Sequence, residues 1–264
     1  MLPTERRQAI VTLVRDQSAV RAEDLAQQFD VSVETVRRDL RLLASNGLLE
    51  RVYGGASTLV KSSEGSFEQR RVSLNAEKRA IGMLAAGLLE GGETILIDVG
   101  TTCHAAARAI STAWYGRVIT NSVPVAIELA DRPLVDVLLT GGWVRHGDLA
   151  CAGSYAARVF DDFNVSIAFV GSGGIHPTLG LTDYHVSEAE LRREWLRHAG
   201  QAYILADSSK LGEVAPCRIA SLDSFAALVT DDGISETLRG DFEREDLPVH
   251  IAVVGRSGTK SPSS

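Results

Sequence analysis

Apolar residues in the first sixty positions recur at helical spacing. The pattern predicts helices over residues 4–15, 21–29 and 33–45, with Ser32 placed as the N-terminal cap of the third. The second helix shows the i, i+3, i+4, i+7 spacing of a single buried face, carried by Ala22, Leu25, Ala26 and Phe29. This part of the chain is therefore expected to pack as a small helical unit.

A hairpin is expected to follow the third helix. Residues 48–51 and 57–60 can pair as two short strands across a turn that contains Tyr53, Gly54 and Gly55. The glycines would let the tip of the hairpin approach another surface closely. Three helices and such a hairpin together predict a winged helix-turn-helix fold for the N-terminal region.

The pattern changes after a stretch rich in Ser, Gly and Glu. Short apolar runs then alternate with helix-length amphipathic segments, which is typical of an α/β fold with a mostly parallel sheet covered by helices. Seven runs are predicted strands, over 94–98, 117–120, 136–140, 166–171, 201–206, 226–230 and 250–254. The predicted organisation is a winged-helix unit (1–60), a linker (61–74), an α/β domain (75–254) and a flexible tail (255–264).

Composition excludes several classes of protein. The chain has 264 residues, 45% of them hydrophobic and 23% charged, which is enough apolar material for a large core. The longest apolar run, Ile81–Leu89, is far shorter than the roughly 20 residues that span a bilayer. The first residues lack an apolar stretch, so we expect no secretory signal, and no cysteine pair has metal-ligand spacing. We expect a cytoplasmic protein with no membrane partner, no metal and no cofactor.

The net charge of −7 argues at first sight against a nucleic-acid partner. It is unevenly distributed, however, because residues 1–60 hold eight arginines and eight carboxylates, so the whole deficit lies in residues 61–264. Whether the chain can bind nucleic acid therefore depends on where its charges lie and not on the net charge.

The third predicted helix has two chemically distinct faces. At 100° per residue, one arc is apolar and the other side carries hydroxyl and guanidinium groups. Such a helix can lie in the major groove of double-stranded DNA, where arginine binds guanine and the hairpin contacts phosphate. The candidate DNA-binding residues are Ser32, Thr35, Arg37, Arg38, Arg41, Arg51, Tyr53, Gly54 and Gly55. The alternative is a solvated face in which the arginines pair with Glu34 and Asp39.

Three segments of this region resemble the winged-helix signature of the DeoR-type bacterial transcription regulators. They are SVETVRRDL (32–40), GLLER (47–51) and YGGA (53–56). Tyr53 departs from the family, which usually has His there, but tyrosine can also donate a hydrogen bond to phosphate. The resemblance implies a repressor that binds an operator. We expect it to act as a dimer or tetramer, because one winged helix contacts too little DNA for a selective site.

The ends of the predicted strands are rich in Gly, Ser and Thr. Ligands of open parallel sheets bind at the carboxyl ends of the strands, and backbone N–H groups at glycine-rich helix starts suit an anionic phosphate. Asp98 and Asn121 could bond sugar hydroxyls. The candidate effector-binding residues are Asp98, Gly100, Thr101, Thr102, Asn121, Ser122, Gly141, Gly142, Gly171, Gly173 and Lys210.

The resemblance extends to this second region through DVGTT (98–102), TNS (120–122), LTGG (139–142), FVGSGGI (169–175), GLTD (180–183) and ADSSK (206–210). It implies a fold similar to ribose-5-phosphate isomerase and an effector that is a phosphorylated sugar or polyol. Arg192 stands where the family commonly has Lys, which puts the ligand role of this position in doubt.

Three alternatives remain open. A sugar-phosphate isomerase or deaminase needs a positioned general base, but residues 170–175 contain no carboxylate. A transcriptional activator would use the same pocket. An architectural DNA-binding protein would use no ligand at all, and the glycine-rich strand ends argue against it.

Overall fold

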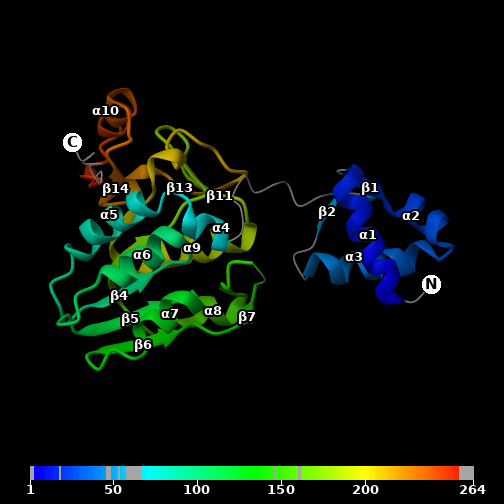
Figure 1. Cartoon of the computed structure of the whole chain (residues 1–264), viewed down its shortest axis with the longest axis horizontal. Helices are drawn as coiled ribbons and strands as arrows, with labels where there is room; N and C mark the ends of the chain where they lie inside the picture. Colours follow the sequence, from blue (N-terminus) through cyan, green and yellow to red (C-terminus); the bar gives the residue numbers. More distant parts are fainter. Residues whose placement is uncertain are drawn as a thin grey trace, which may run out of the picture. The chain divides into compact units, whose positions relative to one another are not determined.

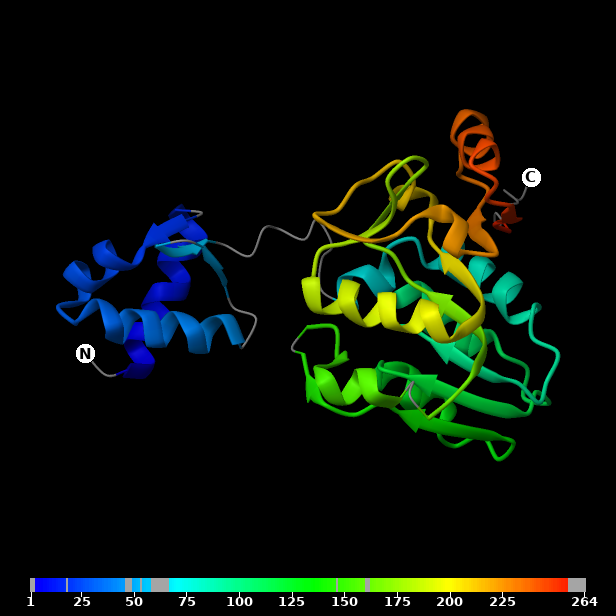
Figure 2. The ribbon, with the colours of Figure 1, turned by 180° about the vertical axis from the view of Figure 1, so that it is seen from behind.

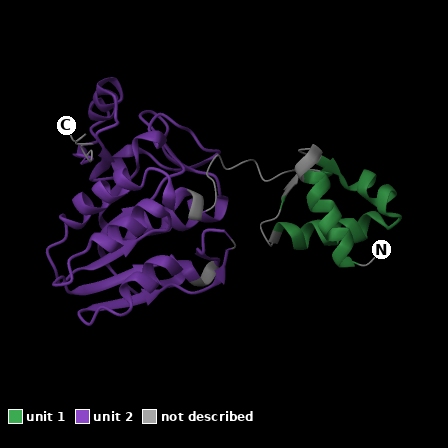
Figure 3. Cartoon of the chain, viewed as in Figure 1, with its two compact units in different colours: residues 1–65 green, residues 66–264 purple. Residues whose placement is uncertain are grey.

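The computed structural model describes residues 3–17, 19–45, 49–52, 54–57, 67–145, 147–159 and 162–255. The chain forms two compact units, Met1–Gly65 and Ser66–Ser264, which are coloured separately in Figure 3. Each unit has its own hydrophobic core. No helix in these ranges has both the length and the apolar character needed to cross a bilayer.

Unit 1 contains three helices around a small core, as predicted. They are α1 (Pro3–Gln17), α2 (Ala22–Phe29) and α3 (Val33–Ser45), labelled in Figure 1. The predicted apolar faces point inward, because Ala22, Leu25, Val36 and Leu40 are each at most 2% exposed. Asp30 adopts a left-handed conformation that ends α2 and turns the chain toward α3.

The sheet of unit 1 differs from the predicted hairpin. Its strands are β1 (Ala19–Arg21), β2 (Glu50–Val52) and β3 (Gly55–Ser57), in the order β1-β3-β2. Glu50 pairs with Ser57 and Val52 with Gly55, so the turn is tighter than one joining 48–51 to 57–60. The pattern missed β1, because three residues between two helices carry too little periodicity to be recognised.

The central sheet of unit 2 has seven strands, all in parallel pairs, with the order β15-β14-β12-β9-β4-β5-β6. Each strand lies within two residues of a predicted one. They are β4 (Thr94–Ile97), β5 (Gly116–Thr120), β6 (Val135–Leu139), β9 (Val165–Val170), β12 (Ala199–Leu205), β14 (Ala227–Asp231) and β15 (Val249–Ala252).

Helices cover both faces of this sheet. Figures 1 and 2 show α5 (Asn75–Ala86), α6 (Thr101–Ala109) and α7 (Val123–Leu129) on one face and α9 (Val186–His198) on the other. Side chains alternate between the two resulting cores along each strand. In β4, Ile95 and Ile97 join the core under α5 and α6, while Leu96 joins the core under α9.

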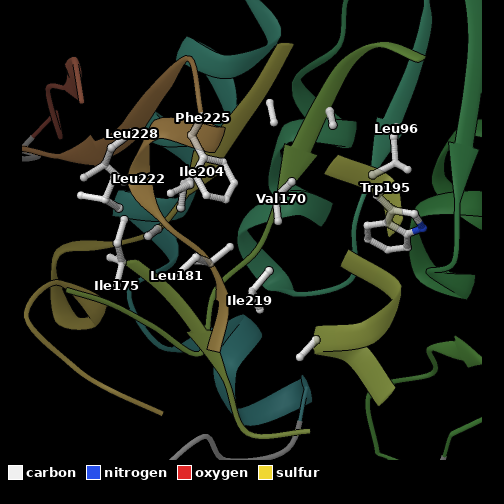
Figure 4. Close-up of a cluster of buried hydrophobic side chains, with 14 of the residues drawn as sticks. Leu96, Val170, Ile175, Leu181, Trp195, Ile204, Ile219, Leu222, Phe225 and Leu228 are labelled. Atoms are coloured by element: carbon white, nitrogen blue, oxygen red, sulfur yellow. The ribbon is translucent and has the colours of Figure 1, made fainter. Parts of the chain in front are cut away.

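Smaller elements complete the second core. A three-stranded sheet consists of β10 (Gly174–His176), β11 (Gly180–Asp183) and β13 (Cys217–Ala220). It contributes Ile175, Leu181 and Ile219 to the buried cluster of Figure 4, which also contains Trp195 of α9. The remaining elements are α4 (Phe67–Val72), β7 (Trp143–Val144), β8 (Cys151–Ala152), α8 (Ser154–Arg158), α10 (Glu236–Arg244) and the 3-10 turns η2 (Ser208–Lys210) and η3 (Leu222–Ser224).

The predicted linker and the predicted tail are each described only in part. Residues 61–66 of the expected linker lie outside the described residues, but α4 occupies its second half as a helix that belongs to unit 2. Of the expected tail, residue 255 is described and residues 256–264 are not.

Candidate functional sites

The arginines of α3 are displayed on its exposed face. Arg37, Arg38 and Arg41 are all exposed, while Val36 and Leu40 on the opposite face are buried. Arg41 lies 2.6 Å from Glu34, and Arg37 lies 3.8 Å from Glu23 of α2. Both pairs are solvent-exposed and therefore weak, so the guanidinium groups can exchange a carboxylate for phosphate or a base edge.

A buried ion pair fixes α3 against α1. Asp39 is 7% exposed, and its Oδ2 accepts a hydrogen bond from Arg6 Nε at 2.7 Å while Arg7 Nε lies 3.3 Å from Oδ1. Asp39 was one of two carboxylates considered as partners of the helix arginines, but it faces the interior. Arg6 and Asp39 are 33 positions apart in the sequence, so no local pattern could indicate this pairing.

The start of α3 is capped as predicted. Ser32 Oγ accepts a hydrogen bond from the Thr35 N–H at 3.2 Å, and the two hydroxyls lie 2.8 Å apart. This cap satisfies one of the backbone donors that a helix N-terminus leaves open. The arrangement fixes the N-terminal end of α3, where groove-reading helices contact bases.

The hairpin residues are described only in part. Gly54 has φ +83°, and a Cβ on Gly55 would lie 2.0 Å from the Val20 carbonyl oxygen, so this approach of β3 to β1 requires glycine. Gly55 thus has a packing role within unit 1. Tyr53 and the side chain of Arg51 lie outside the described residues.

The second candidate site is at the switch point of the parallel sheet. The chain runs outward from β4 to β5 and β6, then returns to the other side of β4 with β9, so the connections diverge between β4 and β9. Ligands of open α/β sheets bind at such a point, outside the carboxyl ends of the strands. Asp98 follows β4, and Gly171 follows β9. The Gly171 N–H donates to Asp98 Oδ2 at 2.9 Å, which brings the two junctions together.

Asp98 is the anchor of a buried charge network. Its side chain is 0% exposed and accepts hydrogen bonds from Arg192 Nε (2.6 Å) and from the N–H groups of Val99 and Gly171. A carboxylate has about four acceptor positions, so at most one remains for a ligand. Burial raises the pKa of Asp98, against the lowering effect of Arg192.

Arg192 occupies the centre of this network. It is 3% exposed and also donates to Asp183 Oδ2 at 2.5 Å, so one guanidinium bridges the ends of β4 and β11. Burial alone would raise the pKa of Asp183, but Arg192 and the His185 N–H hold it below its usual value. Arginine can serve both carboxylates because its donors form a fixed fork, which a lysine does not provide.

Glu188 is a further member that sequence reasoning missed. It lies on α9, one turn before Arg192, and is 1% exposed. Arg145 Nη1 lies 2.9 Å from its Oε1, although the two are not aligned as a hydrogen bond, and Arg145 also pairs with Asp148. Burial raises the pKa of Glu188 to about 7 despite these cations. The i, i+4 spacing of Glu188 and Arg192 was the available signal.

Several oxygen atoms at this edge are buried without a hydrogen-bond partner among the described residues. They include Asn121 Oδ1, Thr140 Oγ1, Ser172 Oγ and both carboxylate oxygens of Glu188. The amide nitrogen of Asn121 reaches only the Cys151 carbonyl, at 3.5 Å. Buried polar atoms are normally paired with protein, water or ligand, so these acceptors are positions that water or a bound ligand can fill.

The remaining predicted residues lie at the same edge. Gly100 forms the N-cap of α6, Thr101 and Thr102 are buried in its first turn, and Ser122 caps α7 by accepting from the Val125 N–H. Gly141, Gly142 and Gly173 lie in the loops after β6 and β9. A Cβ on Gly171 would lie 2.8 Å from the Val99 carbonyl oxygen, so that close contact between junctions requires glycine.

Lys210 lies in η2, after β12. The turn is held from inside, because Asp207 accepts from the Ser209 N–H (3.2 Å) and Asp231 accepts from the Ser208 N–H (2.7 Å). The Lys210 N–H donates to the Asp207 carbonyl oxygen. The backbone donors of η2 are thus engaged within the protein, which differs from the open cradle that the sequence suggested. The described residues contain no cluster suited to holding a metal ion.

Comparison with known proteins identifies the family. A family model described as the DeoR C terminal sensor domain matches residues 74–232, and one described as a DeoR-like helix-turn-helix domain matches residues 6–62. Ribose 5 phosphate isomerase A from Neisseria gonorrhoeae is similar with a TM-score of 0.38 at 14% identity, over 50% of this chain and 52% of that one.

The sequence is similar to those of curated transcriptional regulators along nearly their whole length. The chain is 32% identical to the HTH-type transcriptional regulator GolR of Listeria innocua, over 96% of this chain and 100% of that protein. It is 34% identical to the HTH-type transcriptional repressor CsqR of Escherichia coli (86% and 87%) and 30% identical to the glycerol-3-phosphate regulon repressor of that organism (88% and 92%). This protein therefore belongs to the DeoR family of helix-turn-helix transcriptional regulators.

Proposed function

We propose that the protein represses genes of sugar or polyol catabolism and is released from its operator when a phosphorylated sugar or polyol binds unit 2. The names of the relatives support this function, since one is the repressor of a glycerol-3-phosphate regulon. The observation that carries it is the set of buried oxygen atoms without a hydrogen-bond partner around the charge network at the switch point.

Unit 1 supplies the DNA contacts in this proposal. The exposed arginines of α3 reach base edges and phosphates, and the β2–β3 turn contacts the backbone. One winged helix covers too little DNA for a selective site, so the functional repressor contains at least two copies. Dimer and tetramer both satisfy this requirement.

Unit 2 supplies the effector site. The N-terminus of α6, with Gly100, Thr101 and Thr102, offers unpaired backbone N–H groups and a positive dipole end to the phosphate. Asn121 and Glu188 accept hydrogen bonds from the hydroxyls of the ligand. Asp98 acts mainly through Arg192, which it holds in place.

The proposal is tested in two steps with the full-length protein. Thermal unfolding is measured with glycerol 3-phosphate, ribose 5-phosphate and fructose 1-phosphate, because a ligand at 100 times its dissociation constant adds about 2.7 kcal/mol of stability. Fluorescence anisotropy then follows binding to DNA selected by the protein from a random pool. Stabilisation by one compound together with loss of DNA binding supports the proposal. A stabilising compound that leaves DNA binding unchanged contradicts it.

One observation favours a second candidate, a sugar-phosphate isomerase. Glu188, with a pKa of about 7, could carry a proton between neighbouring carbons. The loop after β9 nevertheless contains no carboxylate, and Asp98 and Asp183 are both bound by Arg192. We expect no interconversion of aldose and ketose phosphates, and a coupled assay that detects turnover abolished by E188Q would establish the enzyme instead.

A further inference from the structure

Helix α4 is the first described element of unit 2 after the segment that joins the two units. Its first residue, Phe67, is 6% exposed and packs edge-on against the His104 ring, with the ring centroids 5.9 Å apart. His104 belongs to α6, the helix whose N-terminus forms part of the effector site. One end of α4 is therefore attached to an element of that site.

The other end of α4 is held by Lys78 of α5. The Nζ donates to the carbonyl oxygens of Arg70 (2.7 Å) and Ser73 (2.9 Å), at the end of α4 and just beyond it. Cations are favoured at the C-terminal end of a helix, where carbonyl groups have no intrahelical partner. The Lys78 side chain is 8% exposed, and a charge buried so far needs partners of this kind.

Lys78 also faces the strand-end loop. Its Nζ lies 3.8 Å from Oδ2 of Asp207, whose side chain is 3% exposed. The other carboxylate oxygen of Asp207 accepts from the Ser209 N–H and hydroxyl and so caps η2. Asp207 is thus shared between the ammonium group that holds α4 and the turn that carries Lys210.

Through these contacts, an added negative charge near Asp207 can change how Lys78 holds the end of α4. In this inference the anionic group of the bound effector also reaches η2, where it competes with Asp207 for the N–H and hydroxyl donors of Ser209. A carboxylate that loses these donors attracts Lys78 more strongly, because its charge is less compensated. Lys78 then moves toward Asp207 and releases the carbonyl groups of Arg70 and Ser73. The end of α4 loses its cationic partner, and α4 is joined by the chain to the DNA-binding unit.

We propose that Lys78 is a positioning residue that couples occupancy of the effector site to α4, and through α4 to the segment leading to the helix-turn-helix unit. The inference rests on the proposed function, because it explains how a bound effector could alter DNA binding. It makes Lys78 necessary for the response to the effector, and not for binding of DNA or effector separately.

The test compares two variants with a matched control. K78M removes the ammonium group and keeps an unbranched apolar side chain. D207N keeps an oxygen that can cap η2 and removes the charge that faces Lys78. R79M is the control, since Arg79 is the exposed neighbour of Lys78 on the same helix. Three quantities are measured for each full-length protein. The first two are the dissociation constants for selected DNA and for the effector, taken as the compound that most stabilises the wild type. The third is the release factor, the fold increase in the DNA dissociation constant when this effector is bound.

The DNA dissociation constants of K78M and D207N are expected to lie within about threefold of the wild-type value. The factor by which the compound weakens DNA binding should be at least tenfold smaller in these two variants than in the wild type, whereas R79M should match the wild type in both quantities. The double variant should be no worse than either single one, because both act on one contact. Full release by K78M overturns the inference while leaving the proposed function intact. If no compound of the panel stabilises the wild type, both the inference and the proposed function are contradicted.

A second measurement covers the case in which K78M does not fold. Hydrogen exchange of the wild type with and without the stabilising compound should show faster exchange of the α4 and 73–74 amides in the bound state. Unchanged exchange there, with DNA released, would also overturn the inference.

Discussion

Glu188 makes the stability of unit 2 depend on pH in a direction opposite to that of most carboxylates. Its pKa is about 7 in the folded protein and 4.5 when unperturbed, so between these values the folded state holds a proton that the unfolded state has lost. Stability therefore falls as pH rises from about 4.5 to 7 and is constant above. The full difference between the two pKa values corresponds to about 3 kcal/mol, of which about 2 kcal/mol is lost between pH 5.5 and 8.

The variant E188Q isolates this contribution. Glutamine is neutral at every pH and close in shape to the protonated acid, so the variant should match the wild type within about 1 kcal/mol at pH 5.5 and exceed it by about 2 kcal/mol more at pH 8. All three tryptophans of the chain, Trp114, Trp143 and Trp195, lie in unit 2. Urea unfolding followed by tryptophan fluorescence therefore reports this unit alone.

The control is E190Q, because Glu190 is exposed on the same helix. It should shift stability by the same small amount at both pH values. If the difference between E188Q and the wild type does not change from pH 5.5 to pH 8, the folded-state pKa of Glu188 is not raised and the reasoning from its burial is refuted.

Three further predictions concern DNA binding and the charge network. R38A should weaken binding to selected DNA by about 1–3 kcal/mol in an anisotropy titration, and an affinity equal to that of R79M would remove Arg38 from the interface. The logarithm of the DNA association constant should fall linearly with the logarithm of salt concentration, since arginines displace condensed counterions, and a flat response would mean few phosphate contacts. D98A should destabilise unit 2 by about 3–5 kcal/mol in urea unfolding, because it leaves Arg192 with less buried negative charge, and a loss below 1 kcal/mol would show that Asp183 and Glu188 suffice.

The sequence predicted the parallel sheet well because its central strands, such as β4 and β14, are buried on both faces. Such strands are continuous apolar runs that stand out between helices, as in Ile95–Ile97 of β4. The strands β10 and β11 were missed because they have three and four residues, and their pairing with β13 joins positions that are far apart in the chain. The predicted register of the β2–β3 hairpin was wrong because the strands pair closer to the turn than the pattern suggested, with Val52 opposite Gly55.

The edge of the sheet at which we propose the effector site could be predicted from the sequence, but the side-chain contacts at that edge could not. Glycine and hydroxyl residues at strand ends indicate the carboxyl edge of a parallel sheet, and the switch point follows from the order of the strands. The contact between Asp98 and Arg192 joins residues 94 positions apart, which no local pattern reveals. The same applies to Arg145 and Glu188, whose burial sets the pKa of that carboxyl group.

The central claim is that one small anionic metabolite binds unit 2 and thereby changes the affinity of unit 1 for DNA. Linkage makes this claim reciprocal, since an effector that weakens DNA binding by a given factor must itself bind the DNA complex more weakly by the same factor. Calorimetric titration of the stabilising sugar or polyol phosphate, into the free protein and into its complex with selected DNA, measures this factor directly. The account predicts at least tenfold weaker binding of the effector to the complex. Equal affinity in the two titrations would contradict it.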